Sequence, residues 1–144
     1  MGVPLIRLER ELPPNPEAAR EARVALGELA PHVPGPHFDD LRLLVTELVT
    51  NSVRHGRLGA GDAIHLLVQM EPTTLRVEVR DPGTGFDAPG PSETPDLGAG
   101  WGLHLLGRIA DRWGIKVGPW TCVWFEIDLS SHDDPTEDRN IENS

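Results

Sequence analysis

Three polar side chains recur at a four-residue spacing in the first half of the chain: Glu47, Asn51 and His55. In a helix, this spacing places all three along one flank, beside the apolar stripe. A carboxylate, an amide and an imidazole in that position could contact a ligand lying over the helix. A solvated helix rim is the alternative, although the apolar neighbours Leu44 and Leu48 argue against it for Glu47.

A second cluster begins at Asp81, where an alternating strand pattern ends. Gly83 and Gly85 follow at the second and fourth positions after it. A carboxylate at a strand end can accept a hydrogen bond from a planar base, and glycines allow a ligand to approach the backbone. An ordinary Asp-Pro-Gly turn is the alternative explanation. This segment on its own therefore leaves base binding and a simple turn open.

Glycines also alternate just before a predicted helix, at Gly98, Gly100 and Gly102, with Leu103 directly after them. Free backbone N–H groups and the positive end of a helix favour phosphate binding. The spacing differs from the G-x-G-x-x-G dinucleotide fingerprint, and no strand leads directly into it. The chain's one lysine, Lys116, lies outside any G-K-[ST] motif, which excludes that type of phosphate loop.

Apolar periodicity predicts the elements that would position these clusters. Residues 5–12 alternate as a strand, and Asn15-Pro16-Glu17 predicts the start of a helix that reaches about residue 29. Prolines at 31, 34 and 36 are expected to end that helix. A second helix is predicted over 39–55. Its buried stripe is expected to consist of Leu41, Leu44, Val45, Leu48 and Ser52.

The second half of the chain is predicted to be mostly strands. Alternation over 64–70 and 75–80, joined by a Pro-Thr-Thr turn, predicts an antiparallel hairpin. A loop rich in Pro, Gly, Ser and acids follows, and then a third helix over 102–113. Closing strands are predicted over 115–117 and 122–129.

Composition limits the class of protein. The chain has 144 residues, 38% of them hydrophobic, and a net charge of −10, which indicates one domain and argues against a nucleic-acid-binding surface. Residues 130–144 hold five acids and one arginine and are expected to be disordered.

The single Cys122 cannot form an intramolecular disulfide, and no apolar segment of the sequence is long enough to span a membrane. With no leader pattern at the N-terminus, the expected compartment is the cytoplasm.

The order of these motifs resembles that of the GHKL superfamily of ATPases and kinases. The chain has E-x-x-x-N on a helix, then a strand ending in D-x-G-x-G, a long loop, and G-x-G-x-G-L before a helix. Residues 47–56, ELVTNSVRHG, are similar to the anti-sigma factor serine/threonine kinases of bacterial partner switching. The resemblance implies an α/β fold of the α+β two-layer type, the Bergerat ATP-binding fold. Its sheet would be mixed but mainly antiparallel, with helices on one face. Residues 1–129 would form the ATP-binding kinase domain and 130–144 the acidic tail.

The resemblance also implies a role for each matched residue. Glu47 would be the general base toward the attacking serine hydroxyl, and Asn51 would ligate Mg²⁺ at the ATP phosphates. Asp81 would bind the adenine amino group, and residues 87–100 would form the ATP lid. The other implied contacts with ATP are His55, Gly83, Gly85, Gly98, Gly100, Gly102, Leu103 and Thr121.

The resemblance implies a cytoplasmic, ATP-dependent protein-serine/threonine kinase that acts as an anti-sigma factor and phosphorylates a small anti-sigma antagonist. Its partners would be a sigma factor, the antagonist and a second copy of the chain, with no direct contact to nucleic acid or membrane. A catalytically silent ATP-binding module, whose nucleotide state switches partner affinity, is the alternative. A sensor histidine kinase would need a phosphoacceptor hairpin, and only about 38 residues precede the predicted second helix.

Overall fold

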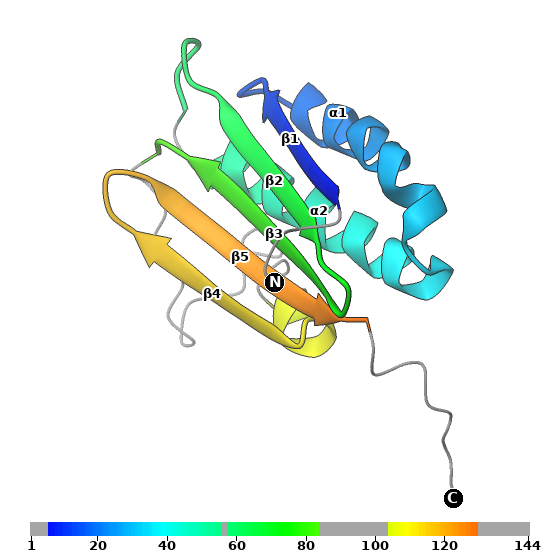
Figure 1. The fold of residues 1–144 in the computed structure, drawn as a ribbon. Coiled ribbons are helices and arrows are strands. Elements are labelled where there is room, and N and C mark those ends of the chain that lie inside the picture. The colour runs from blue at the N-terminus through cyan, green and yellow to red at the C-terminus, as the bar shows by residue number, and fades with distance from the viewer. Residues whose placement is uncertain (1–5, 56–57, 84–103, 130–144) are drawn as a thin grey trace, which may run out of the picture.

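The computed structural model describes residues 6–55, 58–83 and 104–129. They form a five-stranded sheet in the order β1-β2-β3-β5-β4, and the described helices lie against one of its faces (Figure 1). This confirms the predicted two-layer α+β architecture. All four described strand pairings are antiparallel, so the sheet is simpler than the mixed one that the sequence suggested. The predicted lid over 87–100 and the acidic tail lie outside the described residues.

The first three strands follow the predicted alternation. They are β1 (Ile6–Leu12), β2 (Ile64–Met70) and β3 (Thr74–Asp81). The predicted hairpin joins β2 to β3, and its turn is closed by the backbone N–H of Glu71, which donates to the carbonyl oxygen of Thr74 at 2.8 Å. Alternate side chains of β2 and β3 enter the core, as a period of two requires, whereas in β1 the exposed Arg10 lies between the buried Leu8 and Leu12.

The first helical segment changes geometry partway along. Helix α1 covers Glu17–Leu26, and the 3-10 helix η1 continues over Gly27–His32. Asn15 caps the start, since its Oδ1 accepts a hydrogen bond from the backbone N–H of Glu17 at 2.9 Å. The helix predicted to reach residue 29 therefore ends as an α-helix at Leu26, and the tighter η1 accommodates Pro31.

Helix α2 (Gly35–His55) starts four residues before its predicted beginning at residue 39. Pro36 lies in the first turn, where a backbone N–H has no intrahelical partner and a proline is tolerated. The carbonyl oxygen of Pro34 accepts a hydrogen bond from the N–H of Phe38 at 2.8 Å and opens the helix. Interpreting Pro36 as a helix breaker was therefore wrong.

The closing region differs most from its prediction. Residues 104–109 are helical, but the chain then enters β4 (Arg112–Val117), so the helix predicted to reach residue 113 is too long. Strand pairing excludes the longer helix, because Trp113 lies opposite Phe125 of β5 (Thr121–Asp128) in the antiparallel ladder. The predicted helix wrongly includes Arg112 and Trp113, which form the start of β4, a strand whose burial pattern does not alternate.

The core lies between α1, α2 and one face of the sheet. The predicted stripe of α2 is confirmed as buried, Ser52 included. Burial of a side chain of leucine size contributes about 1.5–3 kcal/mol. None of the described helices is long and apolar enough to cross a membrane. The largest fully buried side chains are Phe125, Leu26, Leu29, Leu41, Leu44, Ile64, Leu66, Leu75 and Leu106.

Candidate functional site

The core-facing rows of two neighbouring strands end in polar residues. Val79 of β3 is followed two positions later by Asp81, and Val123 of β5 is preceded two positions earlier by Thr121. Asp81 and Thr121 are opposite each other in the ladder, and each side chain is only 3% exposed. The same alternation that builds the apolar core therefore places a carboxylate and a hydroxyl at one end of its buried face.

Neutral donors hold the Asp81 carboxylate in place. The hydroxyl of Ser52 donates to Oδ2 at 2.7 Å, and the backbone N–H of Gly83 donates to Oδ1 at 2.8 Å. Thr121 in turn donates from Oγ1 to the carbonyl oxygen of Gly83 at 3.1 Å. An ionised carboxylate has lone pairs for further donors, so Asp81 is arranged to accept a hydrogen bond from a ligand amino group.

Helix α2 brings a second set of groups to the same end of the sheet, through its contact between Ser52 and Asp81. Within the described part of the chain, two buried side-chain atoms on α2 lack a hydrogen-bond partner: Oδ1 of Asn51 and Nε2 of His55. A buried polar atom without a partner costs about 1–3 kcal/mol, and such atoms in native proteins require an explanation. A bound ligand or an ordered water supplies such contacts, so two of these atoms four residues apart on one helix flank make it a candidate binding site.

These residues fit a magnesium–nucleotide ligand. Mg²⁺ prefers oxygen ligands and takes few from the protein, so the free amide oxygen of Asn51 suits it. No cluster of three His, Cys, Asp or Glu side chains able to hold a metal occurs among the residues the structure describes. A metal here would therefore take most of its ligands from phosphates and water rather than from carboxylates.

Glu47 lies one helical turn before Asn51 on α2 and is partly exposed. The predicted spacing of Glu47, Asn51 and His55 on one helix is therefore confirmed, and their chemical roles stay predictions. Other residues predicted for the site lie outside the described part of the chain. They are Gly85, Gly98, Gly100, Gly102 and Leu103.

Ser52 is the residue of this site whose role the sequence did not reveal. The sequence placed it in the apolar stripe of α2, which is correct, but gave it no partner. A hydroxyl at a buried position has to be hydrogen-bonded, so its type was a signal that something polar lies opposite. The identity of that partner, Asp81, depends on a contact between residues 29 positions apart.

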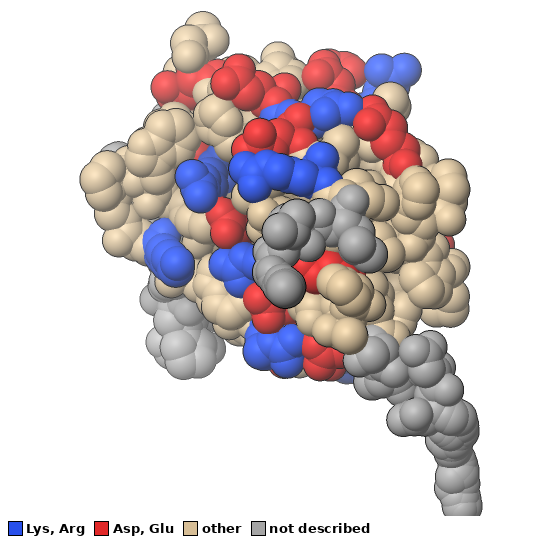
Figure 2. Space-filling view, in the orientation of Figure 1, with Lys and Arg blue, Asp and Glu red and all other residues tan. Residues whose placement is uncertain are grey.

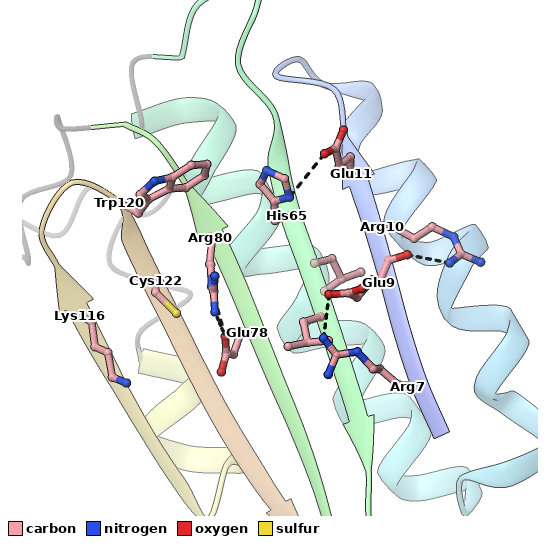
Figure 3. Close-up of a pocket in the computed structure, with 12 residues that line it drawn as sticks. Arg7, Glu9, Arg10, Glu11, His65, Glu78, Arg80, Lys116, Trp120 and Cys122 are labelled. Carbon is pink, nitrogen blue, oxygen red and sulfur yellow. Dashed lines mark hydrogen bonds and ion pairs between the residues drawn. The ribbon is translucent and has the colours of Figure 1, made fainter. Parts of the chain in front are cut away.

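The opposite face of the sheet carries a groove of about 770 Å³. Its lining includes Arg7, His65, Arg80, Lys116 and Cys122, from all five strands (Figure 3). Basic and acidic side chains are interspersed across this face (Figure 2). The sequence predicts no ligand-binding role for these residues, because each belongs to the polar half of a strand pattern.

Many of the charges on this open face neutralise one another. Arg76 bridges Glu78 and Glu126 at 3.2 Å and 2.9 Å, and its guanidinium carbon is 4.5 Å from the centre of the Trp124 ring. Arg112 also binds Glu126, at 2.8 Å. Burial acts to raise the pKa of Glu78, but hydrogen bonds from Arg80 and Arg76 bring that pKa below its ordinary value. Hydrogen bonds from Arg112 and Arg76 likewise lower the pKa of Glu126 against a smaller effect of burial.

Cys122 lies between two cations, with Arg80 and Lys116 opposite it on the neighbouring strands. Even so, burial raises the pKa of its thiol. The cysteine is therefore protonated at neutral pH and a poor nucleophile. The open face thus has a groove and many charged side chains, but Arg76, Glu78 and Glu126 already form ion pairs within the protein.

The chain is similar to several known proteins over much of its length. The family described as "Histidine kinase-like ATPase domain" matches residues 12–127. The anti-sigma F factor of Clostridium acetobutylicum is 31% identical over 87 residues, which cover 56% of this chain and 59% of that protein. The serine-protein kinase RsbW of Listeria innocua is 32% identical over 84 residues, covering 56% of this chain and 54% of the kinase.

The chain therefore spans less than two thirds of the length of these curated relatives. A solved structure containing the RsbU and RsbW domains of a Mycobacterium tuberculosis protein superposes with a TM-score of 0.69. The match covers 88% of this chain and 32% of that one at 21% identity, which supports a shared fold.

Proposed function

The chain belongs to the family of histidine kinase-like ATPase domains, and from this premise we propose that it binds ATP with Mg²⁺ beside α2 and transfers the γ-phosphoryl group to a serine or threonine of a protein substrate. The observation that carries the proposal is the pair of buried atoms without partners, Oδ1 of Asn51 and Nε2 of His55. The fixed carboxylate of Asp81 at the same end of the sheet supplies the complementary site for the base.

The proposed division of the ligand follows from the chemistry of the residues. Asp81 accepts a hydrogen bond from the adenine amino group, since its two protein contacts leave lone pairs on both oxygens. Asn51 holds the metal through its free Oδ1, and His55 contacts the phosphates through Nε2. When bound, Mg²⁺ supplies positive charge that offsets the phosphate oxygens.

Glu47 provides the proton acceptor for the transfer. The substrate hydroxyl oxygen forms a bond to the γ-phosphorus, the bond from that phosphorus to the bridging oxygen breaks, and ADP leaves. The hydroxyl proton passes to the carboxylate of Glu47, which is partly exposed and therefore accessible to a protein substrate. Phosphoryl transfer depends mostly on positioning and charge, so one base on a rigid helix is sufficient protein chemistry.

We further propose that the substrate is a small anti-sigma antagonist and that the chain acts as an anti-sigma factor. The support is the similarity to proteins named anti-sigma F factor and serine-protein kinase RsbW. In this proposal the chain is a cytoplasmic homodimer that binds a sigma factor and makes no direct contact with nucleic acid. Its net charge of −10 is consistent with protein partners rather than a phosphate backbone.

The test combines nucleotide binding with partner recovery. The tagged chain is incubated with extract of its own cells, with and without Mg·ATP, and recovered proteins are identified and assayed with labelled ATP. The proposal predicts recovery of a sigma factor and of a small protein that becomes phosphorylated on serine or threonine. Binding of ATP with no transfer to any recovered protein would instead support the silent regulatory module, and failure of every nucleotide to raise the melting temperature would contradict both.

A further inference from the structure

Ser52 occupies an unusual place for a hydroxyl. It belongs to the buried stripe of α2, is only 9% exposed, and follows apolar positions such as Leu44 and Leu48. A hydroxyl in such a place is costly unless it is hydrogen-bonded. The hydroxyl of Ser52 donates a hydrogen bond to Oδ2 of Asp81 at 2.7 Å. This hydrogen bond also connects the C-terminal half of α2 to the end of β3.

The two contacts of Asp81 fix the orientation of its carboxylate. A carboxylate held through one oxygen can turn about its Cβ–Cγ bond, whereas donors on both oxygens define its plane. Here the donors come from separate parts of the fold, Ser52 on α2 and the backbone of Gly83 after β3. Gly83 is itself held by the hydroxyl of Thr121. Both donors to Asp81 are neutral, so the negative charge of the carboxylate stays available to a ligand.

We propose that Ser52 is a positioning residue, which fixes the carboxylate of Asp81 in the orientation that accepts a hydrogen bond from the 6-amino group of adenine. This inference rests on the proposed function, because it concerns the base of the same nucleotide. A carboxylate fixed as an acceptor attracts an amino group and repels a carbonyl oxygen in the same place. Ser52 acts through Asp81 and does not itself contact the reacting atoms.

The experiment is a cycle that removes the hydroxyl and the amino group separately. Calorimetry measures the binding of ATP and of purine riboside triphosphate, which lacks the 6-amino group, to the wild-type chain and to Ser52→Ala. We expect the wild-type chain to bind ATP at least about tenfold more tightly, the size of one hydrogen bond to a charged group. In Ser52→Ala, ATP affinity should fall by about tenfold, while affinity for purine riboside triphosphate stays within about twofold.

Thr46→Ala is the matched control, because it removes a hydroxyl from the same helix that binds only the carbonyl oxygen of Arg42. It should keep the wild-type ratio of the two affinities. Equal losses for both nucleotides in Ser52→Ala, or no loss for either, would overturn the positioning role and leave the proposed function standing. Failure of the wild-type chain to bind either nucleotide would instead overturn the proposed function.

A folding defect in Ser52→Ala would show as loss of the cooperative thermal transition. Ser52→Cys then provides the same comparison, since its thiol is close in size to the hydroxyl and a weaker donor. We expect the ratio of ATP to purine riboside triphosphate affinity to fall in this variant too. A ratio equal to that of the wild-type chain would overturn the proposal.

Discussion

The two faces of the sheet use polar groups in opposite ways. On the open face, Arg76 forms ion pairs with Glu78 and Glu126, and Glu78 also lines the groove of about 770 Å³. On the helix-covered face, the buried polar residues Asn51, Ser52, Asp81 and Thr121 gather at one end of the sheet. Among the residues the structure describes, Oδ1 of Asn51 and Nε2 of His55 are buried without a hydrogen-bond partner. Charge density and groove size alone would therefore favour the open face as the ligand site, whereas the unpaired polar atoms favour the helix-covered face.

We propose that ATP binds at the helix-covered face, which holds the buried polar atoms without hydrogen-bond partners. A charge that is already paired gives up its partner, or shares it, when a ligand binds, and the gain is correspondingly small. A buried atom that lacks a partner in the free protein gains a full hydrogen bond or metal contact from the ligand. Oδ1 of Asn51 and Nε2 of His55 are therefore the atoms of this face at which a ligand contact gains most.

The largest expected effect is on catalysis at the helix-covered face. Glu47→Gln should lower the rate of phosphate transfer from labelled ATP to the antagonist by about 10²–10⁴-fold, the contribution of a general base. The affinity for ATP should change by less than about threefold, because the amide keeps the size of the side chain. Glu21→Gln, at an exposed position of α1, is the control and should transfer at the wild-type rate. Equal rates for Glu47→Gln and wild type would remove Glu47 as the base.

The next effect concerns the metal. Asn51→Ala should weaken ATP binding by about tenfold or more when Mg²⁺ is present and much less when it is chelated, because only the metal contact is lost. The ligand-free chain should not lose the stability that removal of a hydrogen-bonded buried group costs, because Oδ1 makes no hydrogen bond and its removal relieves an unpaired buried atom. Calorimetry with and without EDTA, and denaturant unfolding, measure the two quantities. Magnesium-dependent binding at full strength in this variant would contradict the assignment.

A smaller effect is expected from the open face, and on stability alone. Glu78 and Glu126 have pKa values below the ordinary 4.5, so their ion pairs stabilise the fold above that pH and are lost as pH falls through the lower, folded-state values. Glu126→Gln should cost about 1 kcal/mol at pH 7 and progressively less under acid conditions. Urea unfolding between pH 7 and pH 3 checks this. A tenfold fall in ATP affinity would place part of the nucleotide site on this face.

The smallest effect is expected at the one lysine. Lys116 is exposed at the edge of the groove, and Lys116→Ala should leave ATP affinity within about twofold and stability within about 0.5 kcal/mol of the wild-type values. Parallel titration with ATP and thermal unfolding would show this. A marked loss of nucleotide binding would mean that the groove, and not the end of α2, receives the phosphates.

Much of the fold was predictable because it depends on periodicity. Alternation identified β1, β2 and β3, and the stripe of α2 identified its buried side. Errors arose where local signals conflict with position. Pro36 breaks a helix in most places but is accommodated in the first turn, and Trp113 fits the end of a helix until its pairing with Phe125 is known.

The site was predictable in its residue types but not in its contacts. The spacing of Glu47, Asn51 and His55 depends only on helix geometry, and the burial of Asp81 follows from its parity with Val79 on β3. The bond from Ser52 to Asp81 joins two elements, and the pairing of Arg76 with Glu126 depends on strand register. Neither can be derived from a local pattern, because each requires the packed structure.

Mapping the backbone amide resonances of the chain during titration with Mg·ATP tests most directly which face binds the nucleotide. Our account predicts the largest shifts at the end of α2, around Asn51 and His55, and at Asp81 and Gly83. Amides of β1, beneath the open face, should move little. Largest shifts around Arg7 and Glu9 of β1, which line the groove, or no shifts at saturating Mg·ATP, would contradict this assignment.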